Sequence, residues 1–212
     1  MKQKNIKPHD IVQVKDVSKF IKSIDSSKWI EESLTKAPFV VVRRGKMLGD
    51  KIPVGIRGDS RDKRHGTYLA ENNILGVIKP YEIANKRLWT KNEHVKKSRI
   101  FEALEVAEKV LNEKKLKWGP TGSTAFELVS NVITINENSD LDILIKISDY
   151  FSVDEAKEIN EKLQKVPCKI DIQLEVEKGI ISLVEYARED NPILLRTNDG
   201  GYILTKEPFK NT

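Results

Sequence analysis

The sequence predicts an α+β fold of two units: a small N-terminal unit with a β-hairpin, and a C-terminal unit in which helices and strands follow one another. Helical and strand periodicities alternate along the chain, and we find no internal repeat. A polar, lysine-rich passage at residues 82–98 separates the two halves. With 39% apolar and 33% charged residues, 212 residues suffice for two small cores. We therefore expect one unit over residues 1–90 and a second over residues 91–212.

The N-terminal unit begins with helical spacing and continues with two apolar stretches. Residues 16–36 carry apolar positions at helical spacing but are interrupted by Asp-Ser-Ser at 25–27, which predicts two short helices. PFVVVRR (38–44) and IPVGIRG (52–58) flank the turn-rich GKMLGDK and predict a hairpin. The segment GDSRDKRHG (58–66) follows, and we expect a basic loop there.

The C-terminal unit is expected to alternate helices and strands. Residues 99–115 place apolar side chains at helical spacing, which predicts a helix with one buried stripe. Ser152 with Glu155 predicts a capping box at the start of a later helix. The remaining expected elements are a helix at 124–130, strands at 132–136, 141–147 and 169–176, a helix near 180–188, and a hairpin at 194–205 that turns at 198–201.

The composition argues against several classes of protein. No window approaches the roughly 18 apolar residues of a membrane span and no apolar segment follows the basic N-terminus, so we expect a cytoplasmic protein without a membrane partner. Cys168 is the only cysteine and the three histidines are scattered, which excludes an internal disulfide and disfavours a soft-ligand metal site. The net charge of +5 suits nucleic acid, an acidic protein or a phosphorylated ligand, and equally a lysine-rich surface.

Two carboxylates stand together in NENSDLDILI, at the start of an apolar strand. Alternate strand residues share a face, so Asp140 and Asp142 point the same way and repel each other unless a cation lies between them. Carboxylate oxygens suit Mg²⁺, which proteins usually hold with one or two carboxylates and substrate phosphates. The alternative is a strand end with solvated acids, or Asp140 capping the preceding turn, and the spacing alone favours that alternative.

Two further features point to phosphate chemistry. GPTGS (119–123) supplies small residues at a predicted helix start, where backbone N–H groups and the Ser123 hydroxyl would hold phosphate oxygens. A simple helix cap, with Thr124 and Glu127 as a capping box, is the alternative. Asp171 lies on the polar side of the predicted strand 169–176, which would bring it beside Asp140 and Asp142 if the two strands are neighbours; an exposed strand acid is the alternative.

In order, Gly-Ser at a helix start, Asp-x-Asp on a strand and a third Asp on a later strand resemble the DNA polymerase β-like nucleotidyltransferase superfamily. This resemblance implies a polymerase β-like mixed sheet with flanking helices. It also implies that Gly122 and Ser123 hold the terminal phosphates of a triphosphate. Asp140, Asp142 and Asp171 would be the catalytic residues and the ligands of two Mg²⁺ ions that activate a hydroxyl for attack on the α-phosphorus.

A narrower resemblance covers nearly the whole chain. WGPTGSTAFELVSNVITINENSDLDILI, KIDIQLEVEKG, ILLRTNDGGYIL and the N-terminal IPVGIRGDSRDKRHG are similar to the phosphoribosyl-dephospho-CoA transferase family of malonate decarboxylase. It implies transfer of that prosthetic group from its triphosphate donor to a serine of the acyl-carrier subunit, with release of pyrophosphate. Residues 1–90 would bind substrate or carrier and residues 91–212 would be catalytic. The family is expected to have Thr-Gly where this chain has Ser130-Asn131, which concerns the local loop only.

The basic run has no role fixed by the superfamily. Its members are Arg57, Arg61, Lys63 and Arg64. They would grip the triphosphate or the CoA pyrophosphate, or dock an acidic carrier; a solvated charged loop is the alternative. Arg43 and Arg44 are expected to line the same site, and Arg196 on the final hairpin is a further candidate for phosphate contact.

Two rival functions remain. A nucleotidyltransferase that uses a nucleoside triphosphate and a small-molecule, protein or RNA acceptor would keep the same site residues. A basic adaptor that binds nucleic acid through residues 57–64 would need no Mg²⁺, but nucleic acid is not the partner we expect. Within the favoured family, the carrier subunit of citrate lyase is an alternative acceptor because it carries a related prosthetic group.

Overall fold

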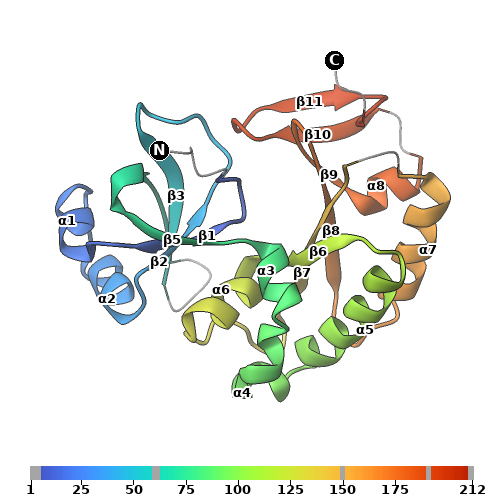
Figure 1. Cartoon of the computed structure of the whole chain (residues 1–212), viewed down its shortest axis with the longest axis horizontal. Helices are drawn as coiled ribbons and strands as arrows, with labels where there is room; N and C mark the ends of the chain where they lie inside the picture. Colours follow the sequence, from blue (N-terminus) through green and yellow to red (C-terminus); the bar gives the residue numbers. More distant parts are fainter. Residues whose placement is uncertain (1–5, 59–62, 149–150, 190–191, 210–212) are drawn as a thin grey trace.

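The computed structural model describes residues 6–58, 63–148, 151–189 and 192–209. It contains two sheets, one in each half of the chain, with helices around both (Figure 1). The predicted α+β class is confirmed, with a small N-terminal unit that contains a hairpin and a larger C-terminal unit built on a mixed sheet. No helix in the described part of the chain has the length and apolar character needed to span a membrane.

The N-terminal sheet has five strands in the order β4-β3-β2-β1-β5, all antiparallel to their neighbours. Its strands are β1 (Ile11–Val14), β2 (Phe39–Val42), β3 (Lys51–Arg57), β4 (Arg64–Ala70) and β5 (Ile74–Ile78). The predicted hairpin is the β2–β3 pair. Residues 64–66 of the expected basic loop instead begin β4, where they pair with the end of β3.

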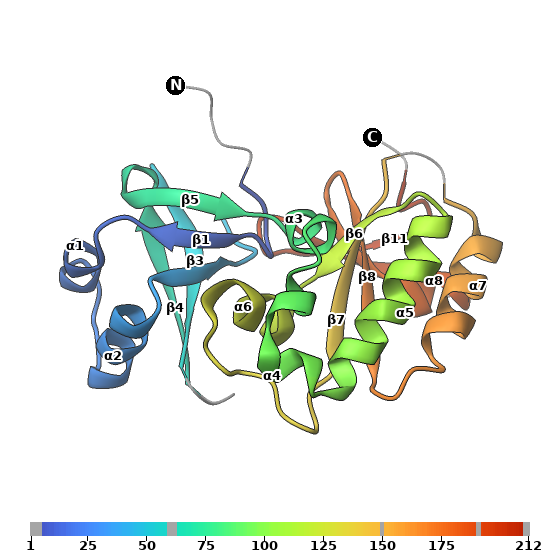
Figure 2. The same ribbon diagram turned by 60° about the horizontal axis from the view of Figure 1, so that its bottom comes forward.

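Two short helices, α1 (Val17–Lys22) and α2 (Lys28–Lys36), cover one face of this sheet (Figure 2). They are separate helices, as the interruption at residues 25–27 predicts. Asp16 caps α1 by accepting a hydrogen bond from the Lys19 N–H. Ile30 and Leu34 of α2 are one helical turn apart and both buried, and each burial stabilises the fold by roughly 1.5–3 kcal/mol.

Three short helices join the halves: α3 (Pro80–Asn85), the 3₁₀ helix η2 (Leu88–Lys91) and α4 (Glu93–Lys96). The polar passage expected at residues 82–98 is therefore helical. Among its buried side chains is Trp89, whose ring centre lies 6.0 Å from that of Trp118. Gly119 makes room for α3, because a Cβ there would lie 1.9 Å from the Pro80 carbonyl oxygen. The junction is thus packed directly against the second sheet.

The C-terminal sheet has six strands in the order β11-β10-β9-β8-β7-β6, and only β7 and β8 are parallel. Its strands are β6 (Lys117–Pro120), β7 (Leu141–Lys146), β8 (Ile170–Val176), β9 (Gly179–Ser182), β10 (Ile193–Thr197) and β11 (Tyr202–Thr205). Its helices are α5 (Arg99–Glu113), α6 (Gly122–Ser130), α7 (Val153–Leu163) and α8 (Leu183–Ala187). α5, α7 and α8 bury one face of the sheet in the larger core (Figure 2). The capping box at Ser152 and Glu155 is confirmed.

Two sequence expectations differ from the structure in this unit. Residues 132–136 form no strand, because the buried Glu127 carboxylate accepts the N–H groups of Thr134 and Ile135 in place of a neighbouring strand. The helix expected near 180–188 starts only at Leu183, since residues 179–182 pair with β8 as β9. Asn131 adopts the left-handed conformation (φ 57°) that ends α6, so it takes a backbone position that favours glycine or asparagine.

Candidate active site

One face of the C-terminal sheet carries the acidic side chains and is turned toward the N-terminal unit. In β8, Ile170, Ile172 and Leu174 lie in the core, so the alternating Asp171 and Glu175 lie on the opposite face. Asp142 of β7 is the register partner of Asp171 in the parallel pair. The expected neighbouring strands are therefore present, and they place these two carboxylates side by side.

Asp140 lies just before β7 and, like Asp142 and Asp171, is half-buried. Its carboxylate is 3.7 Å from the Lys169 ammonium group, and the Lys169 side chain is largely exposed. Within the described ranges, no group of three or more His, Cys, Asp or Glu side chains is arranged to hold a metal ion. The structure thus brings Asp142 and Asp171 together without gathering Asp140 into the same closed cluster.

Gly122 lets the start of α6 approach Asp142. Its φ is +61°, a conformation that L side chains rarely adopt, and a Cβ there would lie 1.9 Å from Asp142 Oδ2. The Thr121 N–H also donates to the Asp142 carbonyl oxygen at 2.8 Å. The helix start predicted to bind phosphate therefore lies directly against one of the predicted catalytic acids.

Arg57 reaches from the N-terminal sheet to this helix start. Its Nη1 donates to Ser123 Oγ at 2.9 Å, and its guanidinium carbon lies 5.9 Å from the centre of the Phe126 ring. Burial, helped by the positive charge of Arg64, lowers the pKa of Arg57 to about 10, while Asp142 acts in the opposite direction. Arg57 therefore stays charged at neutral pH beside the predicted acids.

The other members of the basic run differ in position. Arg64 is the register partner of Arg57 on β4 and shares its face of the sheet. Lys63 lies against Gly58 and lines, with Trp29 and Arg57, a pocket of about 230 Å³ that extends to α6. Arg61 lies outside the described residues.

Arg43 lies across a pair of glycines on the same face of the N-terminal sheet. Gly55 of β3 and Gly66 of β4 are register partners. A Cβ on Gly66 would lie 2.0 Å from Arg43 Nη1, and one on Gly55 would lie 3.3 Å from its Cδ. The two glycines leave the flat channel that this side chain occupies, so the sheet face opposite the acids is basic.

Glu175, near the C-terminal end of β8, is an acid that is paired within the fold. Glu175 is buried and accepts hydrogen bonds from the Tyr81 hydroxyl and the Lys7 ammonium group. Asp10 is also buried and pairs with Lys79 at 3.0 Å. Burial raises the pKa of Asp10, and burial together with Glu175 raises that of Tyr81. This network, which sequence analysis missed, joins the N-terminal strand region to the second sheet.

The predicted metal can be tested against the chemistry of these side chains. Mg²⁺ prefers oxygen ligands, and Asp142 and Asp171 offer adjacent carboxylates on one face, with Asp140 at the strand entrance. The described part of the chain offers no comparable group of histidines or cysteines. The side chains therefore fit a hard divalent cation in donor type, with two of the three acids adjacent.

Comparison with known proteins gives matches over both units. The model of the phosphoribosyl-dephospho-CoA transferase MdcG N-terminal domain matches residues 7–80, and that of the MdcG C-terminal domain matches residues 87–207. Curated proteins named phosphoribosyl-dephospho-CoA transferase are similar over almost their whole length. That of Pseudomonas syringae pv. tomato is 29% identical over 93% of this chain and 91% of its own.

The similarity extends to other bacteria. The protein of the same name from Azotobacter vinelandii is 26% identical over 93% of this chain and 92% of its own, and that from Klebsiella pneumoniae strain 342 is 29% identical over 96% of each. No solved structure gives a significant match. The two family models meet between residues 80 and 87, within the α3 region where the sheets are joined.

Proposed function

The chain belongs to the phosphoribosyl-dephospho-CoA transferase family and is a transferase, and from that premise we propose the reaction it carries out. It moves a phosphoribosyl-dephospho-CoA group from the triphosphate form of that group to a serine of the acyl-carrier subunit of malonate decarboxylase, and pyrophosphate leaves. The observation that carries this proposal is the position of Asp142 beside Asp171, with the Gly122-Ser123 helix start against Asp142.

The chemical step forms one bond and breaks one. The serine oxygen of the carrier bonds to the α-phosphorus of the donor, and the bond from that phosphorus to the pyrophosphate oxygen breaks. We assign Asp171 to accept the serine proton. Its carboxylate receives only a 3.3 Å hydrogen bond from Gln173 and makes no ion pair with a described residue, which leaves it available as a base.

Magnesium is part of the proposal and stays a prediction. Asp140, Asp142 and Asp171 would hold it, and two such ions would lower the pKa of the attacking hydroxyl and neutralise charge on the leaving pyrophosphate. Asp142, pressed against Gly122, fixes the distance between the acidic strand and the phosphate-binding helix start. A larger side chain at residue 122 would separate the two.

The leaving pyrophosphate is expected at the start of α6. Backbone N–H groups at Gly122 and Ser123 and the Ser123 hydroxyl are donors there, at the positive end of the helix. Arg57 already donates to Ser123 and brings a guanidinium to the same place. Its planar donor groups match phosphate oxygens, so we assign Arg57 to stabilise the charge that develops on the leaving group.

The N-terminal unit is proposed to bind substrate or carrier. Its basic face, with Arg43, Arg57 and Arg64, is opposite the acidic face of the second sheet. Such a face suits the phosphates of the donor or an acidic carrier surface. The cytoplasmic location expected from the sequence stays a prediction.

The proposal is tested by intact-mass analysis of an apo acyl-carrier subunit incubated with this protein, triphosphoribosyl-dephospho-CoA and Mg²⁺. We expect the carrier to gain the mass of the phosphoribosyl-dephospho-CoA group, and a carrier with alanine at the acceptor serine to gain nothing. Parallel reactions use the citrate lyase carrier and ordinary nucleoside triphosphates. No gain on either carrier, with modification by a nucleoside triphosphate instead, would show that the chain has the rival nucleotidyltransferase activity.

A further inference from the structure

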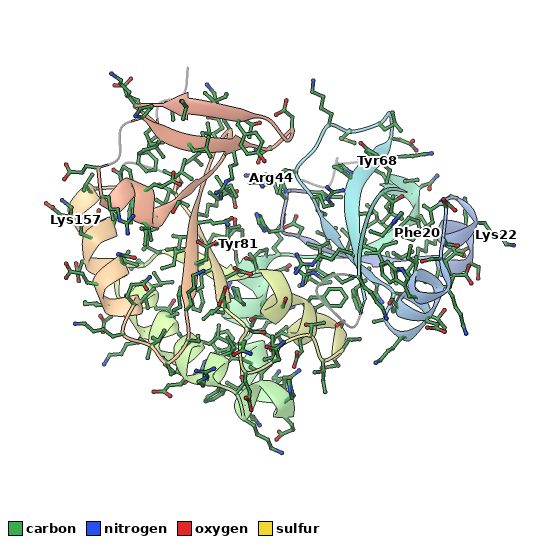
Figure 3. All side chains as sticks on the ribbon, turned by 180° about the vertical axis from the view of Figure 1, so that it is seen from behind. Phe20, Lys22, Arg44, Tyr68, Tyr81 and Lys157 are labelled. Carbon is green, nitrogen blue, oxygen red and sulfur yellow. The ribbon has the colours of Figure 1, made fainter. Side chains whose placement is uncertain are left out.

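Two arginines from different units come together where the C-terminal hairpin meets the N-terminal sheet. The β10–β11 hairpin reaches toward the loop between β2 and β3 (Figure 1). The Gly45 N–H donates to the Asn198 carbonyl oxygen at 3.0 Å, and a Cβ on Gly200 would be 3.4 Å from the Gly45 Cα. Arg44 lies directly before this contact, between the two halves of the molecule (Figure 3), and Arg196 lies on β10 just before the hairpin turn.

Neither arginine has a compensating acid. Arg44 and Arg196 make no side-chain hydrogen bond or ion pair with any residue in the described ranges, and Arg44 Nη1 is buried without a partner. Burial, and then the charge of Arg196, lower the pKa of Arg44. Holding two like charges together with a buried, unsatisfied donor is unfavourable. A bound anion would remove both costs.

A ring nitrogen of His9 lies near Arg44. This Nε2 is buried and has no hydrogen-bond partner among the residues that the structure describes. Burial, followed by the charge of Arg44, lowers the pKa of His9 to about 4, with Glu175 acting in the opposite direction. The ring is therefore neutral at physiological pH and offers a polar atom next to Arg44 without adding charge. Glu175 itself is occupied by Tyr81 and Lys7.

Arg196 lies on the same face of the C-terminal sheet as the predicted catalytic acids. Glu175 is four residues along β8 from Asp171, it pairs with Ile180 of β9, and Ile180 pairs with Arg196 of β10. Strand rise and spacing place Arg196 about 16 Å from Asp171 across the sheet. A ligand that fills both places therefore needs two anionic groups separated by a spacer.

We propose that Arg44, Arg196 and His9 form a second anion site that binds the pyrophosphate of the dephospho-CoA part of the donor. The inference rests on the proposed function, because that donor carries a second oligophosphate, separated from the reacting one by the phosphoribosyl and adenosine riboses. Guanidinium groups match phosphate oxygens in geometry as well as charge. The site takes one arginine from each unit, so the donor itself holds the units together during transfer.

The test is calorimetric titration with dephospho-CoA, without Mg²⁺ and without a carrier, so that it does not depend on turnover. We expect Arg44→Met and Arg196→Met each to raise the Kd roughly 10- to 100-fold. Because the guanidinium groups lack partners, the Tm of each variant should equal or exceed that of the wild type. Arg188→Met, which removes the exposed arginine directly after α8 that makes no ion pair with a described residue, is the matched control and should change neither value.

Further measurements show which group of the ligand the two arginines bind. Adenosine, which lacks the pyrophosphate, should bind all variants alike, and in transfer assays the two arginine variants should raise the KM for the donor more than they lower kcat. Equal dephospho-CoA affinity in wild type and both variants would overturn the inference while leaving the proposed function intact. A larger effect on inorganic pyrophosphate than on dephospho-CoA would also overturn it, since the site would then bind the product. Arginine-dependent binding without carrier modification would contradict the proposed function alone.

Discussion

Asp171 and Glu175 share a strand and a face but differ in environment. Glu175 is buried and receives hydrogen bonds from Tyr81 and Lys7, so its charge is compensated within the fold. Asp171 is half-buried, has one long hydrogen bond from Gln173 and makes no ion pair with a described residue. A compensated acid stabilises the fold that contains it, while an uncompensated one is available to a ligand. A structural acid and a candidate catalytic acid thus lie four positions apart on one strand.

The largest effect on transfer is expected when Asp142, beside Asp171, is substituted. Asp142→Asn keeps the size of the side chain but removes the charge beside Asp171, and we expect transfer to fall at least about a thousand-fold. The Tm should stay close to that of the wild type, because the lost repulsion from Asp171 offsets the lost attraction to Arg57. Intact-mass kinetics of carrier modification and thermal unfolding measure the two quantities. An active variant would rule out this assignment.

Substitution of Glu175 should have the opposite pattern, with a loss of stability and little change in transfer. Glu175→Gln leaves the Lys7 charge uncompensated and weakens the bond to the Tyr81 hydroxyl, so the free energy of unfolding should fall by about 1–3 kcal/mol. Transfer by the folded protein should stay within a few-fold of the wild type. Chemical denaturation and the same kinetics check both. If activity were lost without a change in stability, Glu175 would belong to the catalytic group.

The free energy of unfolding should also depend on pH through His9. Its pKa is about 4 in the folded protein against 6.5 for the free side chain, because burial and Arg44 disfavour the charged ring. The stabilisation that follows is complete above pH 6.5 and is lost as the pH falls toward 4, by on the order of 3 kcal/mol. Asp10, with its raised pKa, acts in the opposite direction, so the measurement compares wild type with His9→Gln. The stability difference between them should shrink over that range, and a constant difference would contradict the prediction.

The smallest effect is expected at Lys169, the partner of Asp140. Their contact is 3.7 Å long and the Lys169 side chain is exposed, so Lys169→Ala should change the free energy of unfolding by less than about 1 kcal/mol and leave transfer nearly unchanged. Denaturation and intact-mass kinetics provide the check. A large loss of stability would show that Asp140 is tied into the fold and belongs with Glu175 in the comparison.

Much of the framework follows from local patterns in the sequence. Strand alternation in residues 169–176 correctly separates the buried isoleucines from Asp171, and the Ser152 capping box correctly marks the start of α7. These features depend on neighbours a few residues away, which a sequence pattern captures. The same alternation places Asp140 and Asp142 on one face but leaves open which strand lies beside them.

Local sequence patterns do not show which residues that are far apart in the chain contact each other. Residues 132–136 have strand composition, yet the Glu127 carboxylate from the preceding helix takes their N–H groups. The pairing of Glu175 with Lys7 joins residues 168 positions apart. Gly66 looks like a turn residue but lies in a strand to make room for Arg43. The basic face therefore emerges only when β2, β3 and β4 are paired in the N-terminal sheet.

The most direct test compares Asp171→Asn with Glu175→Gln in one experiment, with carrier modification and unfolding recorded on the same preparations. We expect Asp171→Asn to lose transfer by orders of magnitude with an unchanged or higher Tm, while Glu175→Gln keeps transfer and loses stability. Full activity of Asp171→Asn, or a loss of folding equal to that of Glu175→Gln, would contradict this expectation.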